Sequence, residues 1–340
     1  MTSSKRCFSP NNRPLTYTSI ESVVEAALDA NATDVHCYSS GTGGYTRFRV
    51  HGALTQPIMV GQQDYSSLIS TLKLRAGMDI ASTTIPQDGH IEFAPAIDLR
   101  ISTLPTSHGE DCAIRILNRT AGLRRLNELG LSTDFESHIR QWAHLQSGLI
   151  LVTGATGSGK TTTLYAIISE ILNIGDRCVV TLEDPIEYPL PGARQSPVKS
   201  GSAHTFSTGL RAVLRQDPDV IMIGEIRDRE TAQTALEAAY TGHLVLSTLH
   251  TASIELTIQR MAQFSLDPFW LSQSIQGIVS QSLTPRYCPC GVGCVSCQNT
   301  GRIGRQLNAE LVSLVGIDDR SALISGSIPE HAVRISSSRC

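Results

Sequence analysis

Hydrophobic and polar positions alternate over much of the first third of the chain. This alternation runs through "YTRFRVHGAL" at 45–54, "DLRIST" at 98–103 and "CAIRIL" at 112–117. A period of two is typical of half-buried β-strands. The apolar spacing from Ile20 to Leu28 instead predicts a short helix. The first part of the chain is therefore predicted to be a mixed α and β domain that is rich in short strands.

The second part of the chain has a different pattern, in which four apolar runs are nearly continuous. These runs are "GLILVTG" at 148–154, "CVVTLED" at 178–184, "VIMIGEI" at 220–226 and "HLVLSTLH" at 243–250. Continuous apolar runs are typical of strands that are buried on both faces of a parallel sheet. Helix-like stretches such as "TTLYAIISEIL" separate the runs, which predicts a doubly wound α/β domain. Each run ends in polar residues, at the edge where ligands bind in such sheets.

These patterns predict a division of the chain into two domains with flanking segments. We expect a flexible leader at 1–18, an N-terminal α+β domain at 19–118, a linker at 119–130, a doubly wound domain at 131–310 that includes a cysteine loop at 288–297, and a C-terminal segment at 311–340. The tail "RISSSRC" is expected to be frayed.

Composition and charge argue against some classes of function. The 340 residues carry a net charge of -3, whereas strong non-specific nucleic-acid binders usually have a clear basic excess. Nucleic acid is therefore not the expected main partner, although a local basic patch remains open. The sequence contains no run of about 18 apolar residues, so no transmembrane helix is expected. The first residues, "MTSSKRCFSP", lack the apolar core of a signal peptide, and we expect a cytosolic protein.

The stretch "GATGSGKTT" at 154–162 matches the pattern G-x-x-x-x-G-K-[ST] of a loop that wraps nucleotide phosphates. It follows a predicted buried strand and precedes a predicted helix, which is the context that this motif requires. Lys160 is expected to reach the β- and γ-phosphates, and Thr161 is expected to hold Mg²⁺. The residues expected to bind ATP are Gly154, Ala155, Thr156, Gly157, Ser158, Gly159, Lys160, Thr161 and Thr162.

Carboxylates follow two of the apolar runs. "TLEDPIEY" contains Glu183, Asp184 and Glu187, and "IMIGEIRD" contains Glu225 and Asp228. An NTPase needs one carboxylate near Mg²⁺ and one polar group that orients the attacking water. Glu225 follows its apolar run directly and is the better candidate for the magnesium side. The alternative is that all of these are solvated loop carboxylates, but the neighbouring phosphate loop favours the catalytic interpretation.

Taken together, these motifs resemble those of the secretion ATPases of the type II and type IV pilus systems, the GspE/PilT superfamily. "TGATGSGKTTTLY" resembles the family's Walker A box, "TLEDPIEY" its aspartate box, "LRQDPDVIMIGEIRDRETA" its Walker B box and "TGHLVLSTLHT" its histidine box. In the first domain, "ATDVHCYSSGTGGYTRFRVHGAL", "PQDGHIEF" and "DLRISTLPTSHGEDCAIRIL" also resemble family stretches. The resemblance implies a PAS-like N-terminal domain followed by a RecA-like ATPase domain with a small cysteine loop.

The resemblance also implies roles for residues at the strand ends. Glu187 corresponds to the glutamate thought to polarise the attacking water, and Glu225 to the Walker B glutamate on the magnesium side. His243 and His250 correspond to the two histidine-box residues thought to sense the γ-phosphate. His250 also stands at the end of a predicted buried strand, whereas His243 stands at its start.

In the family, two arginines of the first domain are thought to move onto the nucleotide as that domain closes. They correspond to Arg100 and Arg115. A guanidinium suits this task because its charge is permanent and its fork can bridge phosphate oxygens. The alternative is an ordinary arginine on a strand surface. The resemblance further implies a homo-hexamer at the cytoplasmic face of the inner membrane, whose domain rotation drives a membrane platform protein and so adds or removes pilin subunits or powers export.

Four of the nine cysteines lie within "CPCGVGCVSC", namely Cys288, Cys290, Cys294 and Cys297. Four thiolates can ligate one tetrahedral Zn²⁺. The second pair has the preferred C-x₂-C spacing, whereas the first pair is one residue short. The export branch of the family carries a four-cysteine element here, so the resemblance implies a shortened zinc loop. The alternatives are a reduced cysteine-rich turn without metal and a redox-sensitive turn.

The sequence leaves the direction of work open. Where the family usually has "QRL" before the cysteines, this chain has Gln281-Ser282-Leu283. Its length is closer to the retraction-type motors, but its cysteine loop is closer to the exporters. Pilus assembly, pilus retraction, type II export and conjugation-related secretion therefore remain alternatives. A scaffold that binds ATP but scarcely hydrolyses it and a nucleic-acid translocase are two further hypotheses, which the intact motifs and the charge argue against.

Overall fold

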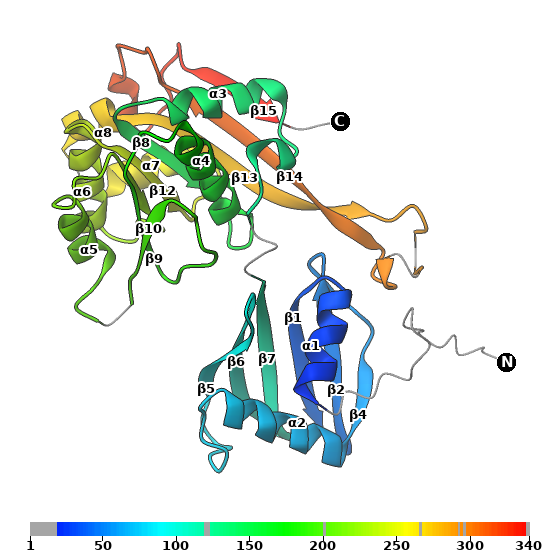
Figure 1. Cartoon of the computed structure of the whole chain (residues 1–340). Helices are drawn as coiled ribbons and strands as arrows, with labels where there is room; N and C mark the ends of the chain where they lie inside the picture. Colours follow the sequence, from blue (N-terminus) through cyan, green and yellow to red (C-terminus); the bar gives the residue numbers. More distant parts are fainter. Residues whose placement is uncertain are drawn as a thin grey trace. The chain divides into compact units, whose positions relative to one another are not determined.

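The computed structural model describes residues 19–118, 123–199, 202–264, 267–291, 293–294 and 297–337 (Figure 1). The predicted leader at 1–18 lies outside these residues. The chain folds as two compact units, one comprising Met1–Arg119 with Pro285–Arg305 and the other Thr120–Thr284 with Gln306–Cys340. The four clustered cysteines therefore group with the first unit, which the sequence pattern does not indicate.

The first unit is built on an antiparallel sheet with the strand order β3-β2-β1-β7-β6-β5, in which β4 also pairs with β2. Two helices, α1 (Ile20–Asp29) and α2 (Gln62–Arg75), pack on this sheet (Figure 1). The strands are β1 Ala32–Ser40, β2 Gly43–Val50, β3 Ala53–Leu54, β4 Ile58–Gly61, β5 Gln87–Ala94, β6 Ile97–Thr106 and β7 Gly109–Asn118.

The periodicity of the sequence accounts for these elements. Helix α1 begins at Ile20 as predicted, because the Ser19 side chain accepts the backbone N–H of Ser22 and caps the helix. Apolar residues at alternate positions of β6, such as Leu99 and Ile101, are buried in the core with both helices. The predicted strands around "DLRIST" and "CAIRIL" are confirmed and are longer than expected, so that a tight turn joins β6 to β7.

The second unit contains a sheet with the order β10-β9-β11-β12-β8-β13-β14-β15, in which the strands from β10 to β13 are parallel. The strands are β8 Gly148–Thr153, β9 Val179–Glu183, β10 Ala193–Pro197, β11 Val220–Ile223, β12 Leu244–Leu249, β13 Ile275–Tyr287, β14 Arg302–Ser313 and β15 Val333–Ser337. The helices are α3 Thr133–Ala143, α4 Lys160–Ile174, α5 Phe206–Val213, α6 Arg229–Tyr240, α7 Ile254–Gln263 and α8 Pro268–Ser274. In the part of the chain that the structure describes, no helix is long and apolar enough to cross a membrane.

Both faces of this sheet are covered, which explains its continuous apolar strands. Leu149 and Leu151 of β8 belong to one core, together with residues of α5, α6, α7 and α8. Ile150 and Val152 of the same strand belong to a second core, which contains residues of α3 and α4. The two helical layers lie on opposite sides of the sheet (Figure 1). The predicted doubly wound arrangement is thereby confirmed.

The C-terminal tail departs from the sequence prediction. Residues 333–337 form β15, which pairs antiparallel with β14. The Ser337 side chain is 2% exposed and accepts the backbone N–H of Ser132 at 2.8 Å. The prediction of a frayed tail is therefore wrong for residues 334–337, because the exposed edge of β14 offers backbone partners that local composition does not reveal.

Candidate functional site

The predicted phosphate loop joins the end of β8 to the start of α4. Gly154 and Gly159 have φ angles of 146° and 89°, values that residues other than glycine rarely adopt. At Gly154 a Cβ atom would lie only 2.2 Å from the backbone oxygen of Gln281, so a larger residue cannot be accommodated there. Ala155, Thr156 and Gly157 are exposed at the tip of the loop. Thr161 and Thr162 are half-buried in the first turn of α4.

Lys160 lies folded against this loop. Its Nζ atom donates to the backbone oxygens of Gly154 at 2.8 Å and Ala155 at 3.1 Å, and lies 3.3 Å from Nδ1 of His250. Burial lowers the pKa of Lys160, against an opposing effect of Glu225. Among the described residues the buried Oγ of Ser158 has no hydrogen-bond partner. An ammonium group, a helix N-terminus and a spare hydroxyl at one loop match the needs of a bound phosphate.

A chain of polar contacts continues from Lys160 across the ends of neighbouring strands. Nε2 of His250, which follows β12, lies 3.0 Å from Oε2 of Glu225, which follows β11. Arg227 donates from Nε to the other oxygen of Glu225 at 2.7 Å, and its Nη1 lies 3.6 Å from Asp184 at the end of β9. The ends of four parallel strands therefore contribute to one cluster of charged side chains. We call Lys160, His250, Glu225 and Arg227 the strand-end relay.

The contacts of the strand-end relay specify how its imidazole is protonated. Lys160 can only donate, so Nδ1 of His250 accepts and the ring proton lies on Nε2, facing Glu225. Burial raises the pKa of Glu225, but the hydrogen bond and charge of Arg227 and the hydrogen bond of His250 outweigh it, and the net pKa is lowered. Glu225 is thus held as an anion beside the phosphate loop.

Glu187 lies beyond the end of β9, on the loop that leads to β10. Its side chain is half-buried, and its negative charge adds to the burial that raises the pKa of Tyr188. Two buried residues support this loop. Glu183 is 2% exposed and accepts hydrogen bonds from Tyr165 of α4 and, at 3.0 Å, from Gln195 of β10. Gln195 also donates to the backbone oxygen of Tyr188, so the loop that carries Glu187 is tied to the sheet.

His243 is not part of the strand-end relay. It precedes β12, and its Nδ1 lies 3.0 Å from the backbone oxygen of Ala238 in α6. Because β12 has six residues, His243 lies about 20 Å along the strand from His250. Within this chain the two histidines therefore lie at opposite ends of β12.

Arg100 and Arg115 belong to the first unit and lie directly opposite each other on β6 and β7. Both lie on the sheet face away from the buried Leu99 and Ile114. Arg115 is well exposed and donates from Nε to Asp34 at 3.0 Å. Their role toward a nucleotide stays a prediction.

Two side chains at the site were not predicted from the sequence. Arg227 stands two residues after Glu225 in "EIRD", and an arginine so close to a strand-end carboxylate is a usable signal in retrospect. Gln281 of β13 hydrogen-bonds to Ser158 of the phosphate loop, although the two residues are 123 positions apart in sequence. Gln281 lies near the loop because β13 pairs with β8, and this strand order cannot be predicted from the local sequence.

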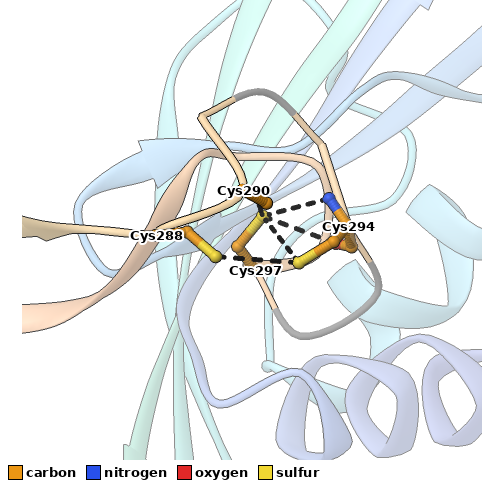
Figure 2. Close-up of side chains that lie close together, drawn as sticks. All are labelled: Cys288, Cys290, Cys294 and Cys297. Carbon is orange, nitrogen blue, oxygen red and sulfur yellow. Dashed lines mark hydrogen bonds between the residues drawn. The ribbon is translucent and has the colours of Figure 1, made fainter.

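The four clustered cysteines form a separate candidate metal centre (Figure 2). Their Sγ atoms all lie within 4.8 Å of one another, and the side chains converge on one point. The pairs 288–294, 290–297 and 294–297 are each separated by 3.7 Å. In a zinc tetrahedron with Zn–S bonds of about 2.3 Å, sulfur atoms are about 3.8 Å apart. The geometry therefore suits a tetrahedral metal ion.

Local backbone groups favour a thiolate in this cluster. The backbone N–H of Cys294 donates to Sγ of Cys297 at 3.4 Å and is the largest cause of a lowered pKa of about 6 for that thiol. The pKa of Cys294 is lowered as well, while a hydrogen bond with Cys288 raises the pKa of Cys290 to about 12. Backbone N–H groups that stabilise negative charge on the sulfurs of Cys294 and Cys297 suit the binding of a cation.

Comparison with known proteins shows which family this combination belongs to. Residues 11–332 match the family described as type II/IV secretion system protein. Type II secretion system protein HxcR of Pseudomonas aeruginosa is 43% identical over 296 residues, which are 83% of this chain and 63% of that protein. Type II secretion system ATPase E of Vibrio cholerae is 42% identical over 273 residues, which are 79% of this chain and 54% of that protein. The chain thus spans between half and two thirds of the length of these two relatives.

Solved structures agree with the sequence relatives. The pilus retraction motor PilT with bound ADP is 29% identical, with a TM-score of 0.66 over 90% of this chain and 86% of that one. The ATPase DotB of Legionella pneumophila is 26% identical, with a TM-score of 0.72 over 92% of this chain and 88% of that one. The predicted fold, an N-terminal α+β domain followed by a doubly wound phosphate-loop domain, is confirmed. The chain belongs to the type II/IV secretion system protein family.

Proposed function

We propose that the chain is a Mg²⁺-dependent ATPase that works as the motor of a type II or type IV secretion or pilus system. The observation that supports this most directly is the strand-end relay, which joins the phosphate-loop lysine to the carboxylate of Glu225 through the imidazole of His250. A motor needs the state of its nucleotide to be linked to the position of other elements. In the relay, any anion that draws Lys160 away from its backbone partners also changes the contacts of His250 and Glu225.

Each residue at the site has a part in this reaction. Lys160 would neutralise the β- and γ-phosphates, and Thr161 and Glu225 would hold the metal ion. Bound Mg²⁺ would offset the negative charge that develops on the phosphate during the reaction. Glu187, held by its buried support, orients the attacking water and accepts its proton. His250 responds to the γ-phosphate through its contact with Lys160.

We further propose that the chain acts as a homo-hexamer on an inner-membrane platform protein, at the cytoplasmic face. The names of its relatives support a secretion system. Sequence identity to type II secretion relatives, at 42–44%, exceeds the 29% identity to the retraction motor, which favours export over retraction. In such a ring, Arg100 and Arg115 of the first unit would close on a nucleotide, and His243 would serve a neighbouring site or none.

Replacing Glu187 with glutamine tests the proposed chemistry. We expect kcat for ATP hydrolysis to fall on the order of 10²-fold, because an amide is a far weaker base than a carboxylate, while the KM for ATP changes little. Phosphate release by the purified full chain in Mg²⁺ measures both constants. The matched control is Glu237→Gln on α6, a half-buried carboxylate that accepts from Gln233 of the same helix. Wild-type protein that releases no phosphate, alone or with a membrane partner, would contradict the proposed function.

We also propose that Cys288, Cys290, Cys294 and Cys297 bind one Zn²⁺. The purified chain is then expected to contain about one zinc ion, measured by elemental analysis. Cys297→Ser should remove the metal, because this buried thiol contacts two of the other three. Cys178→Ser, a change of a half-buried cysteine outside the cluster, should retain it. A folded wild-type chain free of zinc would leave a reduced or redox-sensitive turn as the explanation.

A further inference from the structure

Gln281 connects three points of the phosphate loop. It lies on β13 beside β8 and is 4% exposed. Its Nε2 donates to the backbone oxygen of Ser158 at 2.7 Å, and its Oε1 accepts from the hydroxyl of Thr163 at 2.8 Å. Its backbone oxygen lies against Gly154, at the position where a Cβ atom would be. One residue thus contacts Gly154 at the start of the loop, Ser158 near its end and Thr163 in the first turn of α4.

Each end of this amide has one partner, namely the Ser158 carbonyl in the loop and the Thr163 hydroxyl in α4. The Ser158 carbonyl precedes Gly159, which adopts a left-handed conformation as the cap of α4. The N–H of the same peptide bond is that of Gly159, and it belongs to the segment that wraps phosphates in this motif. A donor that fixes the carbonyl therefore also fixes the direction of the N–H. Without it, a buried carbonyl would lack a partner and the peptide would turn to find one.

We propose that Gln281 is a positioning residue that holds the phosphate loop in the conformation that receives a nucleotide, a role that rests on the proposed ATPase function. Preorganised N–H groups bind phosphate without first spending free energy on ordering the loop. The hydrogen bonds of the side chain go to Ser158 and Thr163, and not to the proposed metal ligands or to Glu187. Its loss should therefore weaken nucleotide binding more than it slows the chemical step, because both bound states use the same loop.

A graded series of variants of the full chain tests this role. Gln281→Met keeps the length and burial of the side chain but removes the amide. Gln281→Glu keeps an acceptor for Thr163 but sets a carboxylate oxygen against the Ser158 carbonyl. Thr163→Val removes only the contact to α4. Ser282→Ala is the control, since the neighbouring residue on β13 is exposed.

The measurements are the Kd for Mg²⁺-ADP, the kcat and KM for ATP, and the melting temperature. We expect the Kd of Gln281→Met to rise about tenfold, the size of one lost buried hydrogen bond, with kcat within about threefold of wild type. Gln281→Glu should be at least as weak, and Thr163→Val should lie between these variants and wild type. A merely structural role would lower the melting temperature and leave Kd unchanged, and that result overturns the proposal.

The two hypotheses fail in different ways. Wild-type protein that binds no nucleotide contradicts the proposed function and removes this role with it. Wild-type protein that binds ADP, beside a Gln281→Met variant with the same Kd, contradicts only the role of Gln281. If Gln281→Met does not fold, Thr163→Val decides, because it removes the hydrogen bond between Thr163 and Gln281 from the helix side. A wild-type Kd for this variant would also overturn the proposal.

Discussion

Replacing Lys160 with alanine is expected to lower kcat/KM for ATP hydrolysis by about 10³-fold, the upper range for one preorganised charged donor. The lysine is 8% exposed and has three polar contacts, all of them to groups that a phosphate would replace or adjoin. Its removal also takes the cationic end from the strand-end relay. We therefore expect both the Kd for Mg²⁺-ATP and kcat to worsen, unlike the Glu187 variant, in which only kcat changes.

The control for this variant is Lys199→Ala, which removes an exposed lysine outside the loop. Phosphate release and equilibrium binding of Mg²⁺-ATP should be measured on the same preparations, because the comparison of the two separates binding from chemistry. Unchanged slow hydrolysis in Lys160→Ala would mean that the observed turnover does not come from this site. In that case the chain would be a nucleotide-binding scaffold and not a motor.

The phosphate loop could be predicted from the sequence because local signals determine it. A continuous apolar run specifies a buried strand, the glycines permit the turn, and the lysine follows at a fixed spacing. The same logic located Glu225 and His250, since each stands just after a buried strand, and the ends of parallel strands meet at one edge of a sheet. His250 and Glu225 do lie 3.0 Å apart.

What the sequence did not reveal depends on which strands become neighbours. Gln281 reaches the loop because β13 pairs with β8 across more than 120 residues, and Arg227 reaches Asp184 because β11 pairs with β9. Local periodicity predicts strands but not their order in a sheet. The cysteine-bearing segment is a similar case. Gln298 of that segment donates to the backbone oxygen of Ala30, a contact within the first unit. No local sequence pattern predicts this contact.

Replacing Glu183 with leucine is expected to lower the free energy of unfolding of the second unit by about 3 kcal/mol, because buried donors lose their acceptor. Those donors are the Tyr165 hydroxyl, the Thr181 hydroxyl and the Gln195 amide. Burial is the largest cause that raises the pKa of Tyr165, so its hydroxyl stays protonated and needs an acceptor. The change should also release the loop that carries Glu187, and we expect kcat to fall with stability.

Tryptophan fluorescence during denaturation by urea can follow this unit alone, since both tryptophans of the chain, Trp142 and Trp270, belong to it. Glu183→Gln keeps an acceptor and should cost much less than leucine. Glu170→Leu breaks a solvent-accessible pair with Arg140 on the same helix layer and should cost less than about 1 kcal/mol. If Glu183→Leu unfolded at the same urea concentration as Glu170→Leu, the donors would have found other acceptors, and the buried network could not be what fixes the position of Glu187.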